Sequence, residues 1–186
     1  MYPIDLTNRM ITPPFLSVLI AGFIKLFGNP VLPFYIYHIL MTSFVVPVLF
    51  YLGKIVFNKK VGWFLVIWAI FFMEFFRYTP TVLKEPTLFL LIPLTLLLLI
   101  KTIKKSSLKY IILFAISFTI LIHTDERYII FLPLFLIFLL IHKNFSVYKK
   151  VITTALWLTI VVFLMLPWTI RNYKVYDQLV ILTPRT

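Results

Sequence analysis

Long apolar runs, separated by short charged breaks, make up most of the chain. A run of about 20 apolar residues is typical of a transmembrane helix, because the hydrocarbon core of a bilayer is about 30 Å thick. We predict a span near each of residues 30–57, 61–79, 86–100, 108–123, 127–142 and 151–170. The pattern therefore predicts an all-α fold, a polytopic integral membrane helical bundle of about six transmembrane helices.

The runs at 108–123 and 127–142 are short for a full crossing. They fit two spans if flanking lysines snorkel and the bilayer thins locally, and they also fit one re-entrant hairpin. We keep two spans as the prediction, with the hairpin as its alternative.

The apolar segment 13–27 predicts a helix of another kind. Two prolines suit its start and Gly28 suits its end. Its length of about 22 Å is too short for a comfortable crossing, so we expect an interfacial helix on the outer surface. We divide the chain into an outer loop at 1–28 and a membrane domain at 29–186. An outer N-terminus without a signal peptide also predicts a fragment of a larger membrane domain, with a further helix ahead of it.

Composition excludes an ordinary soluble protein. The chain is 62% hydrophobic and 13% charged, against about 45–50% and about 25% in soluble domains. Its 186 residues leave no room for a second, soluble domain. The net charge of +12 comes with lysines in short breaks, so we expect no nucleic-acid partner. The absence of cysteine excludes disulfides and thiolate metal sites.

Charge is distributed unequally between alternate breaks. Three breaks carry lysines and no acid: Lys54, Lys59 and Lys60; Lys101, Lys104, Lys105 and Lys109; Lys143, Lys149 and Lys150. Short cytoplasmic loops are rich in basic residues, so we assign these breaks to the cytoplasm. The opposite face receives every acid and every arginine: Asp5, Glu74, Glu85, Asp125, Glu126, Asp177, Arg9, Arg77, Arg127, Arg171 and Arg185. This mixed face is a candidate site, with plain solvated loop charge as the alternative.

The second outer break contains Glu74, Arg77, Lys84 and Glu85. Glu74 and Arg77 have the spacing of a pair on one helix face. Pro86 suits the first position of the next helix, which places Glu85 at a helix N-terminus, where a carboxylate is favoured. There it can ligate a divalent metal, hold an acceptor or cap the helix.

Two further clusters lie on the same face. In the sequence HTDERY, Thr124 can cap the next helix, and Asp125 and Glu126 suit its first turn, or the acids form a charged lip for substrate or metal, with His123 as a third group. At the end of the last run, Arg171 can pair with a phosphate, or it can serve only as an interfacial anchor. The chain has no Gly-rich phosphate loop, nucleophile elbow or HExxH motif.

Three stretches, in this order, resemble the GT-C superfamily of polytopic glycosyltransferases, in particular the family-39-type group with protein O-mannosyltransferase-like and aminoarabinose-transferase-like members. They are TPPFLSVLIAGFIKLFG at 12–28, YLGKIVFNKKVGWF at 51–64 and LPWTIRNYKVYDQLVILT at 166–183.

The resemblance implies an inverting transfer of a sugar from a polyprenyl-phosphate donor to a lipid, protein or polysaccharide acceptor. The reaction would take place on the extracytoplasmic face of the plasma membrane, and the need for a divalent metal stays open. The resemblance implies that Glu85 is the catalytic acid of the second outer loop and that Arg171 lies near the donor phosphate. The residues that we expect to bind substrate are Arg171, Asn172, Arg77, Lys84, Asp125, Glu126 and Arg127.

The chain departs from the family at its start. The family has an acid ahead of the interfacial helix, and the neighbourhood of Asp5, YPIDLTNRM, does not match it. We therefore leave Asp5 unassigned and expect the fragment to be inactive alone. The rival reading is a polytopic transporter or assembly protein without chemistry. Span centres without acids and the lack of an internal repeat count against this rival.

Overall fold

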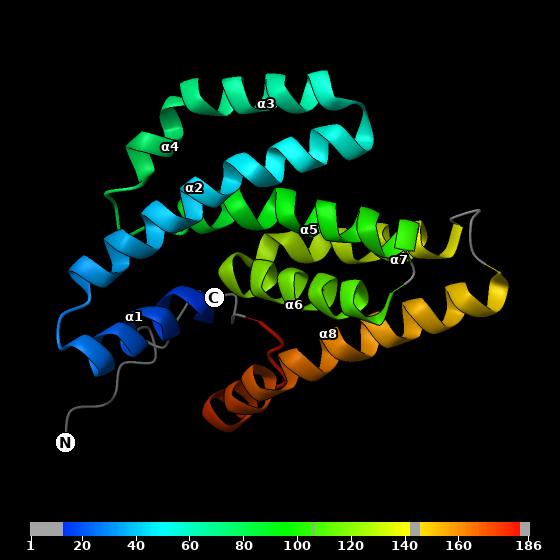
Figure 1. Cartoon of the computed structure of the whole chain (residues 1–186). Helices are drawn as coiled ribbons and strands as arrows, with labels where there is room; N and C mark the ends of the chain where they lie inside the picture. The colour runs from blue at the N-terminus through cyan, green and yellow to red at the C-terminus, as the bar shows by residue number, and fades with distance from the viewer. Residues whose placement is uncertain (1–12, 106, 142–145, 183–186) are drawn as a thin grey trace.

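The computed structural model describes residues 13–105, 107–141 and 146–182, and all regular elements within them are helical (Figure 1). In chain order they are α1 (Pro14–Phe27), α2 (Val31–Val56), α3 (Lys59–Phe71), α4 (Met73–Tyr78), α5 (Glu85–Lys105), α6 (Leu108–Thr124), the 3₁₀ helix η2 (Glu126–Ile130), α7 (Phe131–Ile141) and α8 (Val147–Tyr176). The predicted all-α membrane fold is confirmed. The assignments of Asp5, Arg9, Lys143 and Arg185 lie outside the described residues.

Every predicted span is helical, although the bounds differ. Among the described helices, α2, α5 and α8 are long and apolar enough to cross a membrane, and α6 is a shorter apolar helix of 17 residues. The predicted run 61–79 is divided at Phe72, whose extended ψ of 96° separates α3 from α4. The run 127–142 begins as the 3₁₀ helix, and α8 continues six residues beyond the predicted end at 170 to Tyr176.

Helix α1, expected from the apolar segment 13–27, has the predicted start and stop. Pro14 is its first residue, where a missing N–H costs no hydrogen bond. At its end, Gly28 has a φ of 73° and donates its N–H to the carbonyl of Ile24 at 2.9 Å. This left-handed turn is one that glycine adopts readily, and it sends the chain back along α2.

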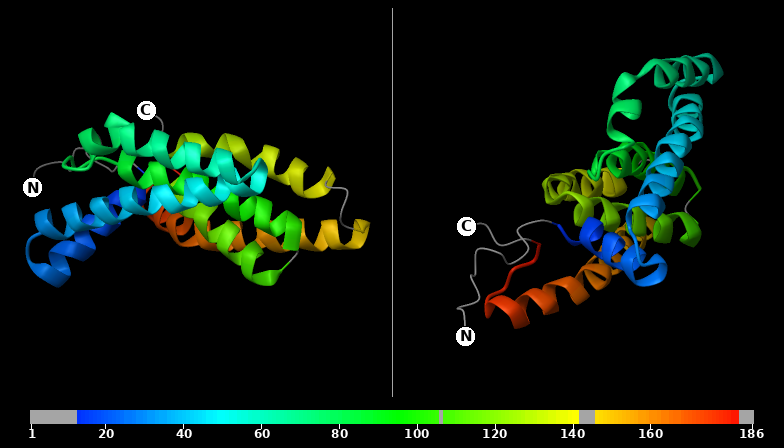
Figure 2. Two further views of the ribbon diagram at one scale, coloured as in Figure 1. Left: turned by 45° about the horizontal axis from the view of Figure 1, so that its top comes forward. Right: turned by 90° about the vertical axis from the view of Figure 1, so that its left-hand side faces the viewer.

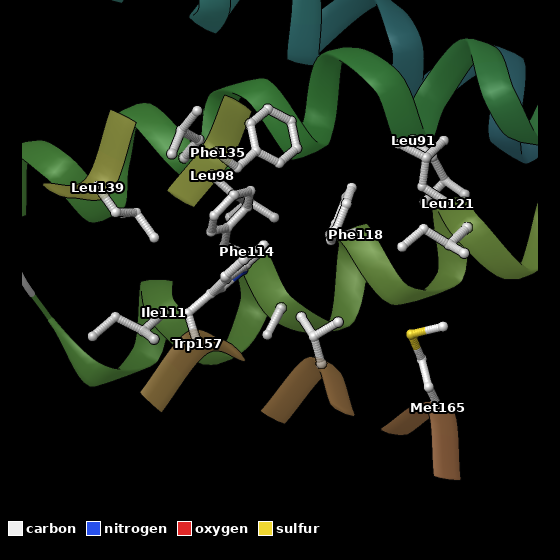
Figure 3. Packing of buried hydrophobic residues seen from close by; sticks show 14 of the residues in the cluster. Leu91, Leu98, Ile111, Phe114, Phe118, Leu121, Phe135, Leu139, Trp157 and Met165 are labelled. Atoms are coloured by element: carbon white, nitrogen blue, oxygen red, sulfur yellow. The ribbon is translucent and has the colours of Figure 1, made fainter. Parts of the chain in front are cut away.

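The main core lies between α5, α6, α7 and α8 (Figure 3). Trp157 of α8 stacks on Phe114 of α6 with ring centroids 5.0 Å apart, and Phe118 and Phe135 pack around them. All four rings are at most 4% exposed. Offset and edge-to-face aromatic pairs of this kind add about 0.5–1.5 kcal/mol each beyond the burial of their area.

The N-terminal helices form a looser layer. Figure 2 shows α3 standing away from the main core, whereas α4 reaches α5, where Phe75 packs against Phe89 with ring centroids 5.0 Å apart. The α2–α3 hairpin closes at Gly53 and Gly62, where a Cβ on Gly62 would lie 2.8 Å from the carbonyl oxygen of Phe50. Much of the outer surface of α3 is exposed and apolar, including Phe64 and Phe71. Such a surface suits lipid rather than water.

The two kinds of break lie at opposite ends of the bundle. The α2–α3 and α5–α6 turns, the end of α7 and the start of α8 lie at one end, and the N-terminus of α5, the N-terminus of η2 and the end of α8 lie at the other (Figures 1 and 2). At the lysine end, the Lys104 ammonium donates to the carbonyl of Ile55 at 3.1 Å, which joins two of these turns. The alternation read from the sequence thus separates two ends of the folded molecule.

Candidate functional site

Two cavities lie beside α1 at the end of the bundle that carries acids and arginines. The larger cavity, of about 510 Å³, is lined by Pro14, Phe15, Val18, Ile116, Thr119, Ile120, His123, Leu164, Pro167, Trp168 and Arg171. The smaller cavity, of about 200 Å³, is lined by Pro13, Leu16, Ser17, Val82, Leu83, Lys84, Glu85 and Thr124. Consecutive residues of α1 and of the end of α6 line different cavities, so the two cavities lie on opposite sides of these helices.

The larger cavity is apolar apart from Thr119, His123 and Arg171. The Arg171 guanidinium carbon lies 4.7 Å from the centre of the Trp168 ring, within range for a cation–π interaction. The predicted phosphate-pairing residue therefore sits on the wall of an otherwise apolar space.

Asn172 forms a hydrogen bond with this arginine and so fixes the position of its guanidinium. Its side chain is fully buried, and its Oδ1 accepts a hydrogen bond from Nη1 of Arg171 at 3.1 Å. Its Nδ2 donates to the carbonyls of Val180 and Leu182 at 3.1 and 2.8 Å. The Trp168 indole N–H donates to the same Leu182 carbonyl at 2.7 Å. The segment after α8 is thus folded back on the helix end through the buried Asn172. Contact of Asn172 with a substrate stays a prediction.

His123 also lines the larger cavity, with a fixed ring orientation. Its Nδ1 lies 2.9 Å from the carbonyl oxygen of Thr119. Because a carbonyl can only accept, this contact is a hydrogen bond when Nδ1 carries the proton. Nε2 is then the ring nitrogen left for other contacts.

Glu85 is the first residue of α5, as the sequence predicted. It lines the smaller cavity, and its Oε2 is buried with no hydrogen-bond partner among the described residues. A helix N-terminus stabilises the ionised form of such a carboxylate. This acid therefore combines an unused oxygen with a place on a cavity wall.

Asp125 joins the second and third breaks of this face. Its carboxylate is 2% exposed, and Oδ2 lies 2.9 Å from Nζ of Lys84 and 2.6 Å from Nη2 of Arg127. The hydrogen bonds from Arg127, followed by that from Lys84, hold the pKa of Asp125 far below its usual range. Asp125 is therefore a fixed anion, and it places Lys84 on the wall of the smaller cavity.

One capping prediction is wrong. Asp125, rather than Thr124, caps η2, because its carboxylate accepts the backbone N–H of Arg127 at 3.1 Å. Thr124 is the last residue of α6, and its hydroxyl donates to the carbonyl of Ile120.

The remaining predicted residues lie elsewhere on this face. Arg77 pairs with Glu74 at 3.6 Å, as its spacing predicted, but its side chain is 72% exposed and lines neither cavity. Glu126 also lies outside both cavity walls. Within the described ranges no three His, Cys, Asp or Glu side chains form a group that could hold a metal ion. A metal at Glu85 would need ligands from elsewhere.

The sequence analysis missed His38. This residue lies in α2, is fully buried and brings its Nδ1 within 3.2 Å of the carbonyl oxygen of Thr79, ahead of Lys84 and Glu85. The sequence offered one signal for this residue. An ionisable side chain in the middle of an apolar span costs free energy to bury, so such residues usually have a role.

Comparison with protein families gives one match. A family model described as dolichyl-phosphate-mannose-protein mannosyltransferase matches residues 12–170. Neither the comparison with curated proteins nor that with solved structures gives a match.

Proposed function

The chain belongs to the dolichyl-phosphate-mannose-protein mannosyltransferase family of the GT-C superfamily, and from that premise we propose that it is a membrane glycosyltransferase. It transfers a sugar from a polyprenyl-phosphate donor to a lipid, protein or polysaccharide acceptor. The observation that carries this proposal is the pair of adjoining cavities, one apolar with an arginine and one with a carboxylate.

The larger cavity suits the donor. A polyprenyl phosphate joins an apolar chain to an anion, and the cavity joins apolar walls to Arg171. Arg171 pairs with the phosphate while Asn172 and Trp168 hold its guanidinium. Asn172 therefore contributes to donor binding through Arg171.

The smaller cavity suits the chemistry. Glu85 takes the proton of the acceptor hydroxyl as the hydroxyl oxygen forms a bond to the anomeric carbon. The bond from that carbon to the phosphate oxygen breaks, and its electron pair leaves with the polyprenyl phosphate. Arg171 stabilises the charge on the departing phosphate, and attack from the opposite face inverts the anomeric centre.

The ion-paired cluster around Asp125 supports this site. Asp125 and Arg127 fix Lys84 beside Glu85, where its ammonium can hydrogen-bond a sugar or acceptor hydroxyl. Substrate contacts by Arg77 and Glu126 stay predictions. We place this end of the bundle on the extracytoplasmic side of the plasma membrane, because the lysine-rich turns lie at the other end.

A transfer assay on a full-length protein that contains this chain, reconstituted in liposomes, tests the assignment of Glu85. With a polyprenyl-phosphate-mannose donor, Glu85→Gln should lower the transfer rate by about 10²–10⁴-fold, the usual contribution of a general base. Membrane insertion should not change, since the amide keeps the shape of the side chain. Glu74→Gln is the matched control, because Glu74 lies on the same face outside both cavities. Wild-type rates in Glu85→Gln would remove the catalytic role.

A further inference from the structure

A buried imidazole lies beneath the segment that leads to the smaller cavity. His38 is fully buried in α2, with its ring 4.1 Å from the ring of Phe34. Burying a polar ring costs free energy unless hydrogen bonds compensate it. The Nδ1 atom of its ring reaches outside α2 to the chain just after α4.

The ring of His38 contacts the backbone of Thr79. Its Nδ1 lies 3.2 Å from the carbonyl oxygen of Thr79, which can only accept, so this contact is a hydrogen bond when Nδ1 carries the proton. The Nδ1 contact therefore ties His38 to the start of the non-helical segment 79–84.

The neighbouring residue makes a second tie, this time between α2 and α5. The Tyr37 hydroxyl lies 3.0 Å from the Thr87 hydroxyl, in the first turn of α5. Consecutive side chains of α2 thus hold the chain before Lys84 and after Glu85. The segment between these ties carries four residues of the smaller cavity, Val82, Leu83, Lys84 and Glu85.

We propose that His38 is a positioning residue, which holds the 79–84 segment through the Thr79 carbonyl and so sets where Lys84 and Glu85 stand in the smaller cavity. The effect on transfer rests on the function proposed for Glu85, whereas the effect on the segment does not. A displacement of about 1 Å at a reacting group can cost about 100-fold in rate, so such a tie matters for catalysis.

Four substitutions separate the hydrogen bond from simple packing. His38→Leu fills the space without a donor, and His38→Gln keeps a polar side chain but moves its nitrogen one bond further out. His38→Asn places an amide nitrogen at the position of Nδ1 and restores the donor. Phe34→Leu is the packing control, because it removes a ring that contacts His38 and leaves the hydrogen bond in place.

The absence of cysteine gives a clean probe of the segment. Val82 is 54% exposed, so Val82→Cys can carry a nitroxide spin label as the sole labelled site. Electron paramagnetic resonance on the reconstituted protein reports the mobility of that label, with no need for substrate. The same variants without the label are assayed for transfer.

We expect the label to become more mobile in His38→Leu and His38→Gln and to keep wild-type mobility in His38→Asn and Phe34→Leu. In the transfer assay, His38→Leu and His38→Gln should lower kcat about tenfold with donor KM changed less than about twofold, and His38→Asn should recover most of the rate. Unchanged mobility in both His38→Leu and His38→Gln overturns the proposal, as does failure of Asn to restore it. If His38→Leu does not fold, His38→Gln decides alone. Absent transfer in the wild type, with the mobility pattern intact, would overturn the proposed function and leave the tie established.

Discussion

The two cavities share α1 as a wall but differ in size and in chemistry. The larger one, about 510 Å³, is apolar around Arg171, and the smaller one, about 200 Å³, has the buried oxygen of Glu85 and the ion-paired Lys84. A cation in an apolar wall suits an anion with a lipid tail, whereas a carboxylate with an unused oxygen suits proton transfer. The difference teaches that binding and chemistry can be attributed to separate groups of residues.

The largest effect on the larger cavity should come from Arg171→Ala. It removes the charged hydrogen bonds to the donor phosphate, worth about 1.5–3 kcal/mol, so donor affinity should fall about 10–100-fold. Titration of donor against transfer rate in liposomes measures the change. Lys174→Ala is the control, because it removes an exposed cation near the end of the same helix. Equal losses in both variants would mean that surface charge alone attracts the donor.

A smaller effect, on the other cavity, is expected from Asp125→Asn. Without the carboxylate, Lys84 loses its partner at 2.9 Å and leaves its place beside Glu85, so kcat should fall about tenfold while donor affinity holds. Asp177→Asn, at the exposed left-handed end of α8, is the control. A loss of donor affinity instead of rate in Asp125→Asn would break the division of roles between the cavities.

The same carboxylate predicts a pH dependence of stability. Because its folded-state pKa lies below the ordinary value of 3.8, the ion pairs stabilise the fold above that value and are lost as pH falls through the folded pKa. This contribution to the melting temperature should therefore be level from about pH 8 to pH 5 and decline below about pH 4. Melting curves of wild type and Asp125→Asn should converge in acid. A difference in melting temperature between the two proteins that stays constant over the whole pH range would contradict the ion-pair assignment.

The smallest effect should come from Asn172→Ala, which affects the donor only through the position of Arg171. Loss of the buried amide frees the Arg171 guanidinium and the carbonyls of Val180 and Leu182. At about 1 kcal/mol for a hydrogen bond, donor KM should rise about fivefold with kcat unchanged. Tyr173→Phe, at an exposed neighbour, should leave KM as it is. A donor KM as high as that of Arg171→Ala would mean that the loss of Asn172 disrupts the whole end of α8 and not only the position of Arg171.

Features that depend on local chemistry could be predicted from the sequence. Apolar runs gave the helices, Gly28 gave the end of α1, and Pro86 gave Glu85 its place at the start of α5. The break at Phe72 could not be predicted, because residues 63–73 around it contain no glycine, proline or charge.

Features that depend on tertiary contacts were out of reach. Lys84 and Asp125 are far apart in the chain and meet only when α5 and α6 pack together. The sequence predicted that both residues lie on the same side of the membrane. It could not show that their side chains form an ion pair. The two cavities and the role of His38 likewise depend on how α1 and α2 pack against the rest.

Mapping of a photoreactive donor tests the separation of the cavities most directly. A polyprenyl-phosphate-mannose analogue with a diazirine on its first isoprene unit, crosslinked to the reconstituted protein, should label walls of the larger cavity such as Ile116, Ile120 and Leu164. Glu85→Gln should keep this labelling and Arg171→Ala should lose it. Labelling spread evenly over exposed residues such as Phe163, and unchanged by Arg171→Ala, would contradict the account.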